Sequence, residues 1–188
     1  GLHPSVADDV NGNFGRFNAF AFSGMRATGT VPGELRARGL DPQAVRTILM
    51  THLHVDHASG LSQFPEARVV VDRREWAATS GGALHGYHRP QFAHVQPELV
   101  DPQEPSDGFR HTHDVFGDGS VVMAATPGHT LGHCSFVVRT AAGPVLVAGD
   151  AIYTRENLEE GRVPLKMEDP KAYRDSIRQL NAWRSLHP

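Results

Sequence analysis

Short runs of apolar residues, separated by polar and Gly- or Pro-containing segments, set the pattern along much of the chain. Runs rich in Val, Ile and Leu, bounded by turn-forming residues, are typical of buried strands. The runs predicted as strands cover residues 45–50, 67–72, 120–126, 134–140 and 144–149.

Helical segments are predicted between and after these runs. Pro32–Leu40 has Pro near its start and Gly39 near its end, and residues 73–79 (RREWAAT) are typical of a short helix. Asp169 and Pro170 form a plausible cap and first turn of a final helix. Its apolar residues fall at spacings of three and four, which predicts an amphipathic helix: Tyr173, Ile177, Leu180 and Trp183 or Leu186.

Two stretches have no clear period. Residues 1–30 are rich in Gly, Asn and Phe and are predicted as loop with at most one short strand. Residues 80–112 contain scattered Gly, Pro, His and aromatic residues. A structureless stretch of that length is uncommon in a compact domain, so we interpret it as a lid, a binding loop or a partly helical insertion. The chain is otherwise predicted to be a single domain over 1–188.

Composition narrows the possible functions. The chain has 188 residues, of which 39% are hydrophobic, enough to bury a core. The net charge of -3 disfavours nucleic acid as a partner, and we find no apolar stretch of about 18 residues that would span a membrane. Cys134 cannot form an internal disulfide and is expected to be a buried thiol, which favours a reducing, cytoplasmic location. The Gly1 start leaves a removed leader open.

Histidine is the unusual residue, with 12 in the chain. Residues 51–61 (THLHVDHASGL) place three His and one Asp within six positions, directly after the strand predicted at 45–50. Side chains two apart on an extended segment point to the same side, so His52 and His54 would face one point. Asp56 and His57 follow where the chain turns and can face another. This spacing therefore favours two adjacent metal ions.

Two other predicted strands also end in possible ligands. His129 follows strand 120–126 in the sequence TPGHTLGH, and Asp150 follows strand 144–149. Functional groups of α/β sheets gather beyond strand ends, so these loops are expected to converge on one site. The candidate metal ligands are His52, His54, Asp56, His57, His129 and Asp150.

This ligand set suits zinc, which prefers imidazole nitrogen and carboxylate oxygen. One ion would bind His52, His54 and His129, and a second would bind Asp56 and His57. Asp150 would bridge the two ions. Two ions about 3.5–4 Å apart would hold a bridging hydroxide, which predicts hydrolysis.

Each residue taken by itself has a simpler explanation. His129 could be an ordinary turn residue, and Asp150 could be a capping or turn residue. His133 is expected to support the site or the fold rather than bind metal directly. The other His residues are expected to be exposed or packing residues.

The motif His52-Leu53-His54-Val55-Asp56-His57, followed by His129 and Asp150, resembles the metallo-β-lactamase superfamily. The resemblance runs from about Pro32 to Leu186. It implies an α/β fold, an αββα sandwich of two mixed β-sheets flanked by helices, with the metals at one edge.

Within this superfamily the chain is similar to N-acyl homoserine lactone lactonases, the quorum-quenching type. In those enzymes the bridging Asp is followed three residues later by a Tyr, which corresponds to Tyr153 here. The resemblance implies that the Tyr153 phenol bonds the substrate carbonyl or the forming oxyanion. A Tyr packed with its hydroxyl satisfied is the alternative. The lactone ring would open to a hydroxy acid, with a proton delivered through Asp56 or water.

The acyl tail of such a substrate would lie against the 80–112 insertion and the Phe-rich start, where Phe20, Phe22 and Phe92 are candidates that could equally be core. The resemblance also implies a further metal-binding His after one more strand, and first strands with an Asp-x-Gly turn, neither of which is evident. Either the sequence is trimmed at both ends or the second metal is held weakly.

Two alternatives to a lactonase follow. One is a hydrolase of the same fold that acts on another ester or thioester, and the other is a catalytically weak relative that binds metal or ligand. A homodimer is a further expectation.

Overall fold

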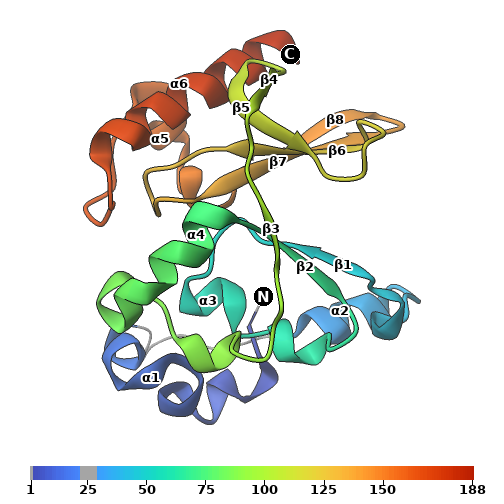
Figure 1. Ribbon diagram of the computed structural model, residues 1–188, viewed down its shortest axis with the longest axis vertical. Helices are drawn as coiled ribbons and strands as arrows, with labels where there is room; N and C mark the ends of the chain where they lie inside the picture. The colour runs from blue at the N-terminus through green and yellow to red at the C-terminus, as the bar shows by residue number, and fades with distance from the viewer. Residues whose placement is uncertain (1, 22–28) are drawn as a thin grey trace. The chain divides into compact units, whose positions relative to one another are not determined.

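The computed structural model describes residues 2–21 and 29–188, which form two compact units (Figure 1). The first unit comprises the described residues up to Val71 together with Thr79–Glu98. The second comprises Asp72–Ala78 and Leu99–Pro188. The chain therefore passes more than once between the units. A single domain with an insertion over 80–112 stays a prediction.

The first unit contains mostly short elements. Its helices and strands, with the two strands that continue into the second unit, are η1 Pro4–Ala7, α1 Val10–Ala21, α2 Val31–Ala37, η2 Pro42–Ala44, β1 Thr47–Leu49, α3 Val55–Ala58, η3 Leu61–Gln63, β2 Arg68–Asp72, η4 Thr79–His85, η5 Arg89–Gln91 and β3 Glu98–Val100. The strands form a three-stranded sheet in the order β1-β2-β3.

Strands β1 and β2 pair in parallel, with Ile48 opposite Val69. The pairing continues beyond β1, because the Met50 amide donates to the Val70 carbonyl at 3.0 Å. Val69 and Val70 are buried, as expected for a Val-rich parallel strand. This pairing fixes the point from which the His-rich segment leaves the sheet.

The start of the chain differs from the prediction. Residues 10–21 form α1 rather than loop, with a break at Gly15, whose φ is 74° and ψ 150°. Phe14 and Asn18 are both buried and lie four residues apart. The side-chain Nδ2 of Asn18 donates to the Phe14 carbonyl at 3.3 Å. This helix was not predicted because polar and Gly residues interrupt the apolar period along its buried face. Residue Phe22 lies outside the described residues.

The second unit is built on an antiparallel sheet in the order β4-β5-β6-β7-β8. Its elements are α4 Arg73–Ala78, β4 Glu104–Ser106, β5 Phe109–Asp114, β6 Val121–Ala125, β7 Cys134–Thr140, β8 Gly143–Val147, η6 Gly149–Ala151, α5 Arg155–Glu160 and α6 Pro170–Leu186.

Helix α6 covers one face of this sheet (Figure 1). Asp169 caps it, accepting hydrogen bonds from the amides of Lys171 and Ala172 at 2.9 Å each. Its predicted apolar face is confirmed: the side chains that pack against Phe109, Val122 and Val137 are Tyr173, Ile177, Leu180 and Trp183. Burying an aliphatic or aromatic side chain of this size stabilises a fold by about 1.5–3 kcal/mol, so this face anchors the sheet.

Residues 80–112 are more ordered than their sequence suggested. They contain the 3-10 helices η4 and η5 and three strands or parts of strands, β3 to β5. β5 has the sequence FRHTHD, in which Phe109 and Thr112 are buried. Because β5 contains two His and a buried Thr, its apolar and polar residues do not alternate clearly, and the strand could not be recognised from the sequence.

Candidate metal centre

The His-rich motif begins where β1 ends and continues into α3. His52 and Leu53 are fully buried, and His54 is the N-cap of α3, with extended dihedral angles (φ −61°, ψ 157°). The amides of His57 and Ala58 donate to the His54 carbonyl at 3.0 and 2.9 Å. The chain thus changes from extended to helical at His54, as the spacing of the motif predicted.

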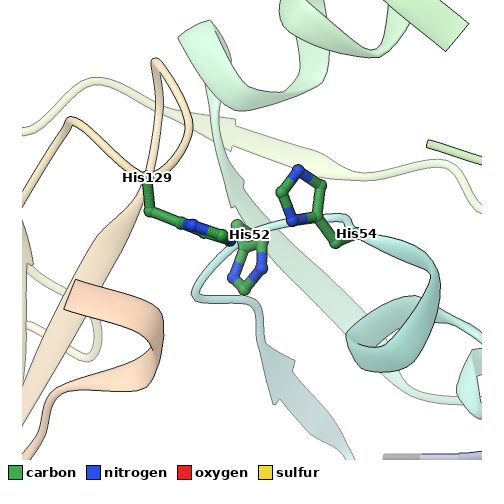
Figure 2. Close-up of side chains that lie close together, drawn as sticks. All are labelled: His52, His54 and His129. Carbon is green, nitrogen blue, oxygen red and sulfur yellow. The ribbon is translucent and has the colours of Figure 1, made fainter. Parts of the chain in front are cut away.

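The imidazoles of this segment lie close together. The His52 ring centroid is 4.7 Å from that of His54 and 4.0 Å from that of His57. Asp56 extends the cluster, because its Oδ2 lies 3.6 Å from His57 Nε2. Figure 2 shows His52 and His54 leaving the same segment, and His129 on the turn after β6. One short segment therefore gathers three imidazoles and a carboxylate.

The segment Gly86–Tyr87 packs against His54 and positions its side chain. The Val55 amide donates to the Gly86 carbonyl at 3.1 Å. A Cβ at Gly86, whose φ is 84°, would lie 2.8 Å from His54 Cδ2. The Tyr87 ring lies 5.2 Å from the His54 ring. Gly86 is therefore required both for its backbone angle and for the room it leaves to the imidazole.

The second unit contributes a turn between β6 and β7. In this turn the Thr126 amide donates to the His133 carbonyl at 2.9 Å, and the Gly128 amide donates to the Thr130 carbonyl at 2.9 Å. A Cβ at Gly128 would lie 2.4 Å from the Tyr173 backbone. The sequence TPGHTLGH therefore forms a tight turn, with a largely buried His129 at its tip.

Asp150 lies beside His129, on η6. Its Oδ2 is 3.4 Å from His129 Nε2. Its amide donates to His133 Nε2 at 3.1 Å, and His133 Nδ1 lies 2.9 Å from the Thr126 hydroxyl. His133 is thus a buried residue that supports Asp150, in keeping with its expected indirect role.

Tyr153 contacts both of these candidate ligands. Its Oη lies 2.9 Å from His129 Nδ1 and donates to Asp150 Oδ2 at 3.1 Å. The side chain is 48% exposed, so the phenol can also meet a molecule from solvent. Its amide donates to Asn157 Oδ1, in the capping box that begins α5. The Tyr153 hydroxyl thus contacts two candidate ligands and is also accessible from solvent.

The donor pairs within each unit fit a divalent ion. Two ligand atoms each about 2.1 Å from a tetrahedral zinc ion lie about 3.4 Å from each other. His129 Nε2 and Asp150 Oδ2 are 3.4 Å apart, and His57 Nε2 and Asp56 Oδ2 are 3.6 Å apart. Imidazole and carboxylate are also the ligand types that zinc prefers, so both sets suit metal binding.

Other sequence candidates have different roles. Phe92 is buried as a core residue, whereas Phe20 on α1 is 88% exposed. His187 stacks on Trp183 with ring centroids 4.6 Å apart, and its Nδ1 lies 3.0 Å from the Trp183 carbonyl. His187 is thus the C-cap of α6. The sequence interpretation missed Glu75, a buried acid on α4.

The comparisons with known proteins agree with this arrangement. The family model described as the metallo-beta-lactamase superfamily matches residues 19–184. The chain belongs to this superfamily, and the predicted fold of two sheets flanked by helices is confirmed. This family uses divalent metal ions, and the chain carries His and Asp side chains of the kinds that bind them.

Among its relatives, the N-acyl homoserine lactonase AttM of Azorhizobium caulinodans is 32% identical over 192 residues, with 96% of this chain and 68% of the relative covered. A solved N-acyl homoserine lactone hydrolase, with the product N-hexanoyl-L-homoserine at its catalytic metal centre, has a TM-score of 0.72 and 29% identity. An AiiA variant from B. thuringiensis with N-decanoyl-L-homoserine bound has the same values. Each structural match covers 96% of this chain and 68% of the other.

None of the described helices is long and apolar enough to cross a membrane.

Proposed function

We propose that this protein is a metal-dependent hydrolase that opens the ring of N-acyl homoserine lactones. The observation that carries the proposal is the contact of the Tyr153 hydroxyl with both His129 and Asp150. Relatives and solved structures named as N-acyl homoserine lactone hydrolases support the same substrate class.

The proposed centre would take its ligands from the 52–57 segment and from the loops after β6 and β8. His52, His54 and His57 would join His129 and Asp150 around two divalent ions, with zinc as the first candidate. All five side chains are of types that could hold a metal ion. Asp56, whose Oδ2 lies 3.6 Å from His57 Nε2, would complete the second ligand set.

When bound, the ions would polarise the lactone carbonyl and lower the pKa of a water molecule. Tyr153 would donate its phenol hydrogen to the carbonyl oxygen, where negative charge develops. Water adds to the carbonyl carbon, the ring C–O bond breaks, and the ring oxygen takes up a proton. Asp56, a partly exposed carboxylate beside His57, would pass on that proton. The product is an open N-acyl hydroxy acid.

The acyl tail would lie on the described surface near the start of the chain. Phe20 is the exposed aromatic candidate there, and Leu84 on η4 is 74% exposed. Phe92 is buried and therefore cannot contact the acyl tail. The tail would then contribute to binding, and so to KM, more than to the chemical step.

The test combines metal analysis with a substrate panel. The protein is expected to bind close to two zinc ions per chain and to open acyl homoserine lactones faster than linear esters or thioesters. A chain that binds two ions and prefers a thioester would overturn the lactone assignment while keeping the hydrolase. A chain that binds one ion or none and turns over no lactone would make it a binding relative.

The proposal also includes a cytoplasmic homodimer. A buried Cys134 suits a reducing compartment. Light scattering on the purified protein measures the oligomeric state, and a monomer at working concentration would contradict the dimer.

A further inference from the structure

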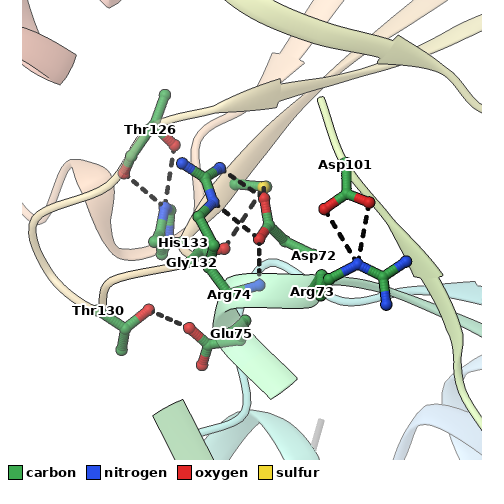
Figure 3. Close-up of polar contacts among 10 residues, drawn as sticks. Asp72, Arg73, Arg74, Glu75, Asp101, Thr126, Thr130, Gly132 and His133 are labelled. Atoms are coloured by element: carbon green, nitrogen blue, oxygen red, sulfur yellow. Dashed lines mark hydrogen bonds and ion pairs between the residues drawn. The ribbon is translucent and has the colours of Figure 1, made fainter. Parts of the chain in front are cut away.

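The turn that carries His129 is tied to α4 by one buried hydrogen bond. The Thr130 hydroxyl donates to Glu75 Oε2 at 2.6 Å, and both side chains are almost completely buried. Figure 3 shows this bond between the turn and α4. A hydroxyl donor to a carboxylate in a dry environment makes a short, strong bond. Neither residue belongs to the ligand set proposed above.

Thr130 is the centre of the turn. Its carbonyl accepts from the Gly128 amide at 2.9 Å and from the His133 amide at 3.5 Å. Its hydroxyl is bound to Glu75, so backbone and side chain are both fixed. Since Thr130 directly follows His129, these bonds also restrain the backbone from which the His129 imidazole projects.

Glu75 rests on a helix that cannot easily shift. A Cβ at Gly132 would lie 2.0 Å from the Glu75 amide nitrogen, so the turn and α4 are in close backbone contact. At the start of α4, Asp72 accepts from the Arg74 amide at 2.7 Å and from its guanidinium at 3.0 and 2.6 Å. The Cys134 thiol also donates to Asp72 Oδ2, at 3.7 Å. α4 is therefore a fixed support for the turn.

We propose that Glu75 and Thr130 are positioning residues that set the orientation of the His129 imidazole toward its ion. The inference rests on the proposed function in one respect, the assignment of His129 as a metal ligand. It adds a residue pair, Glu75 on α4 and Thr130 in the turn itself, whose role is to hold that ligand in place before the ion binds.

The size of the effect follows from the place of the bond. Residues that orient metal ligands typically change metal affinity by about 10–100-fold when they are replaced. Thr130→Val keeps the shape of the side chain and removes its hydroxyl, so the turn loses its bond to Glu75. We expect Thr130→Val to weaken Co²⁺ binding by about 10-fold or more. Thr130→Ser keeps the hydroxyl and should remain close to the wild type.

The experiment measures Co²⁺ affinity by chelator competition, together with the visible absorption spectrum of the Co²⁺-loaded protein. Thr112→Val is the matched control, because the buried Thr112 hydroxyl donates to the Glu104 carbonyl at 2.7 Å in the same unit. A purely structural role predicts equal effects of the two Val variants. The positioning role predicts weaker Co²⁺ binding and an altered spectrum for Thr130→Val, and neither for Thr112→Val.

Glu75→Gln provides a second test if Thr130→Val does not fold. The amide can still accept from Thr130 but lacks the charge, so a smaller loss of affinity is expected. Unchanged Co²⁺ affinity and spectrum in either folded variant would overturn the inference and leave the proposed function intact. A wild-type protein that binds no Co²⁺ or Zn²⁺ would overturn both.

Discussion

Tyr153→Phe removes one oxygen atom from the centre of the proposed site and leaves the ring in place. The Tyr153 hydroxyl makes contacts of 2.9 Å to His129 and 3.1 Å to Asp150. Because the side chain is 48% exposed, water can replace these contacts. A hydrogen bond contributes about 0.5–1.5 kcal/mol to stability when buried, so we expect the free energy of unfolding to fall by less than about 1 kcal/mol.

The catalytic effect should be much larger. Loss of one donor to a developing oxyanion lowers kcat by about 100–1000-fold. A divalent ion would still polarise the same oxygen, so we expect the lower end, about 100-fold in kcat, which corresponds to about 2.7 kcal/mol. KM should change little, because the donor bonds the transition state more strongly than the substrate.

The assay follows proton release on lactone opening, with zinc content and thermal unfolding measured on the same preparations. Tyr173→Phe is the matched control, since it removes a phenol oxygen from a buried Tyr of the same unit. An unchanged kcat for Tyr153→Phe at full zinc occupancy would refute the proposed role. A loss of zinc in proportion to the loss of kcat would instead make Tyr153 a support for the ligands.

Three further predictions concern the second unit. Burial, followed by the negative charge of Asp72, raises the pKa of the Cys134 thiol well above its usual range, so a thiol reagent should label it only as fast as the fold opens. Burial, followed by the charge of Asp150, raises the pKa of Tyr173 to about 12. This phenol ionises first in the unfolded chain, near pH 10, so the wild type should lose stability from about pH 10 to 12. In denaturant titrations the Tyr173→Phe variant should lose less stability than the wild type over this pH range, and an equal loss would contradict the raised pKa of Tyr173. Gly132→Ala should lower the free energy of unfolding by about 3 kcal/mol or more, because its Cβ would lie 2.0 Å from the Glu75 backbone, and a neutral effect in urea titration would disprove this close contact.

The sequence predicted the parts of the fold that carry a strong period. The buried residues of α6 lie three and four positions apart, and β2, β6 and β7 are rich in Val. Both patterns were therefore recognisable in the sequence. α1 and β5 were not, because Asn18 and Thr112 occupy buried positions as polar residues. Their amide and hydroxyl find partners in the chain itself, which only the folded structure reveals.

The site was predictable within each unit. Strand-end position and spacing were enough to group His52, His54 and His57, and the Pro-Gly turn indicated the place of His129. Glu75 carried no such signal, because an acid on a short helix normally lies in solvent. Its importance comes from burial and from its bond to Thr130, a contact over 55 positions in sequence.

The central claim is that the 52–57 segment and the His129–Asp150 pair bind the same ions. A crystal grown with zinc, with anomalous scattering measured at the zinc edge, tests this claim most directly. We expect two zinc peaks, each within bonding distance of ligands from both segments. Zinc bonded by the 52–57 segment while His129 and Asp150 face elsewhere would contradict it.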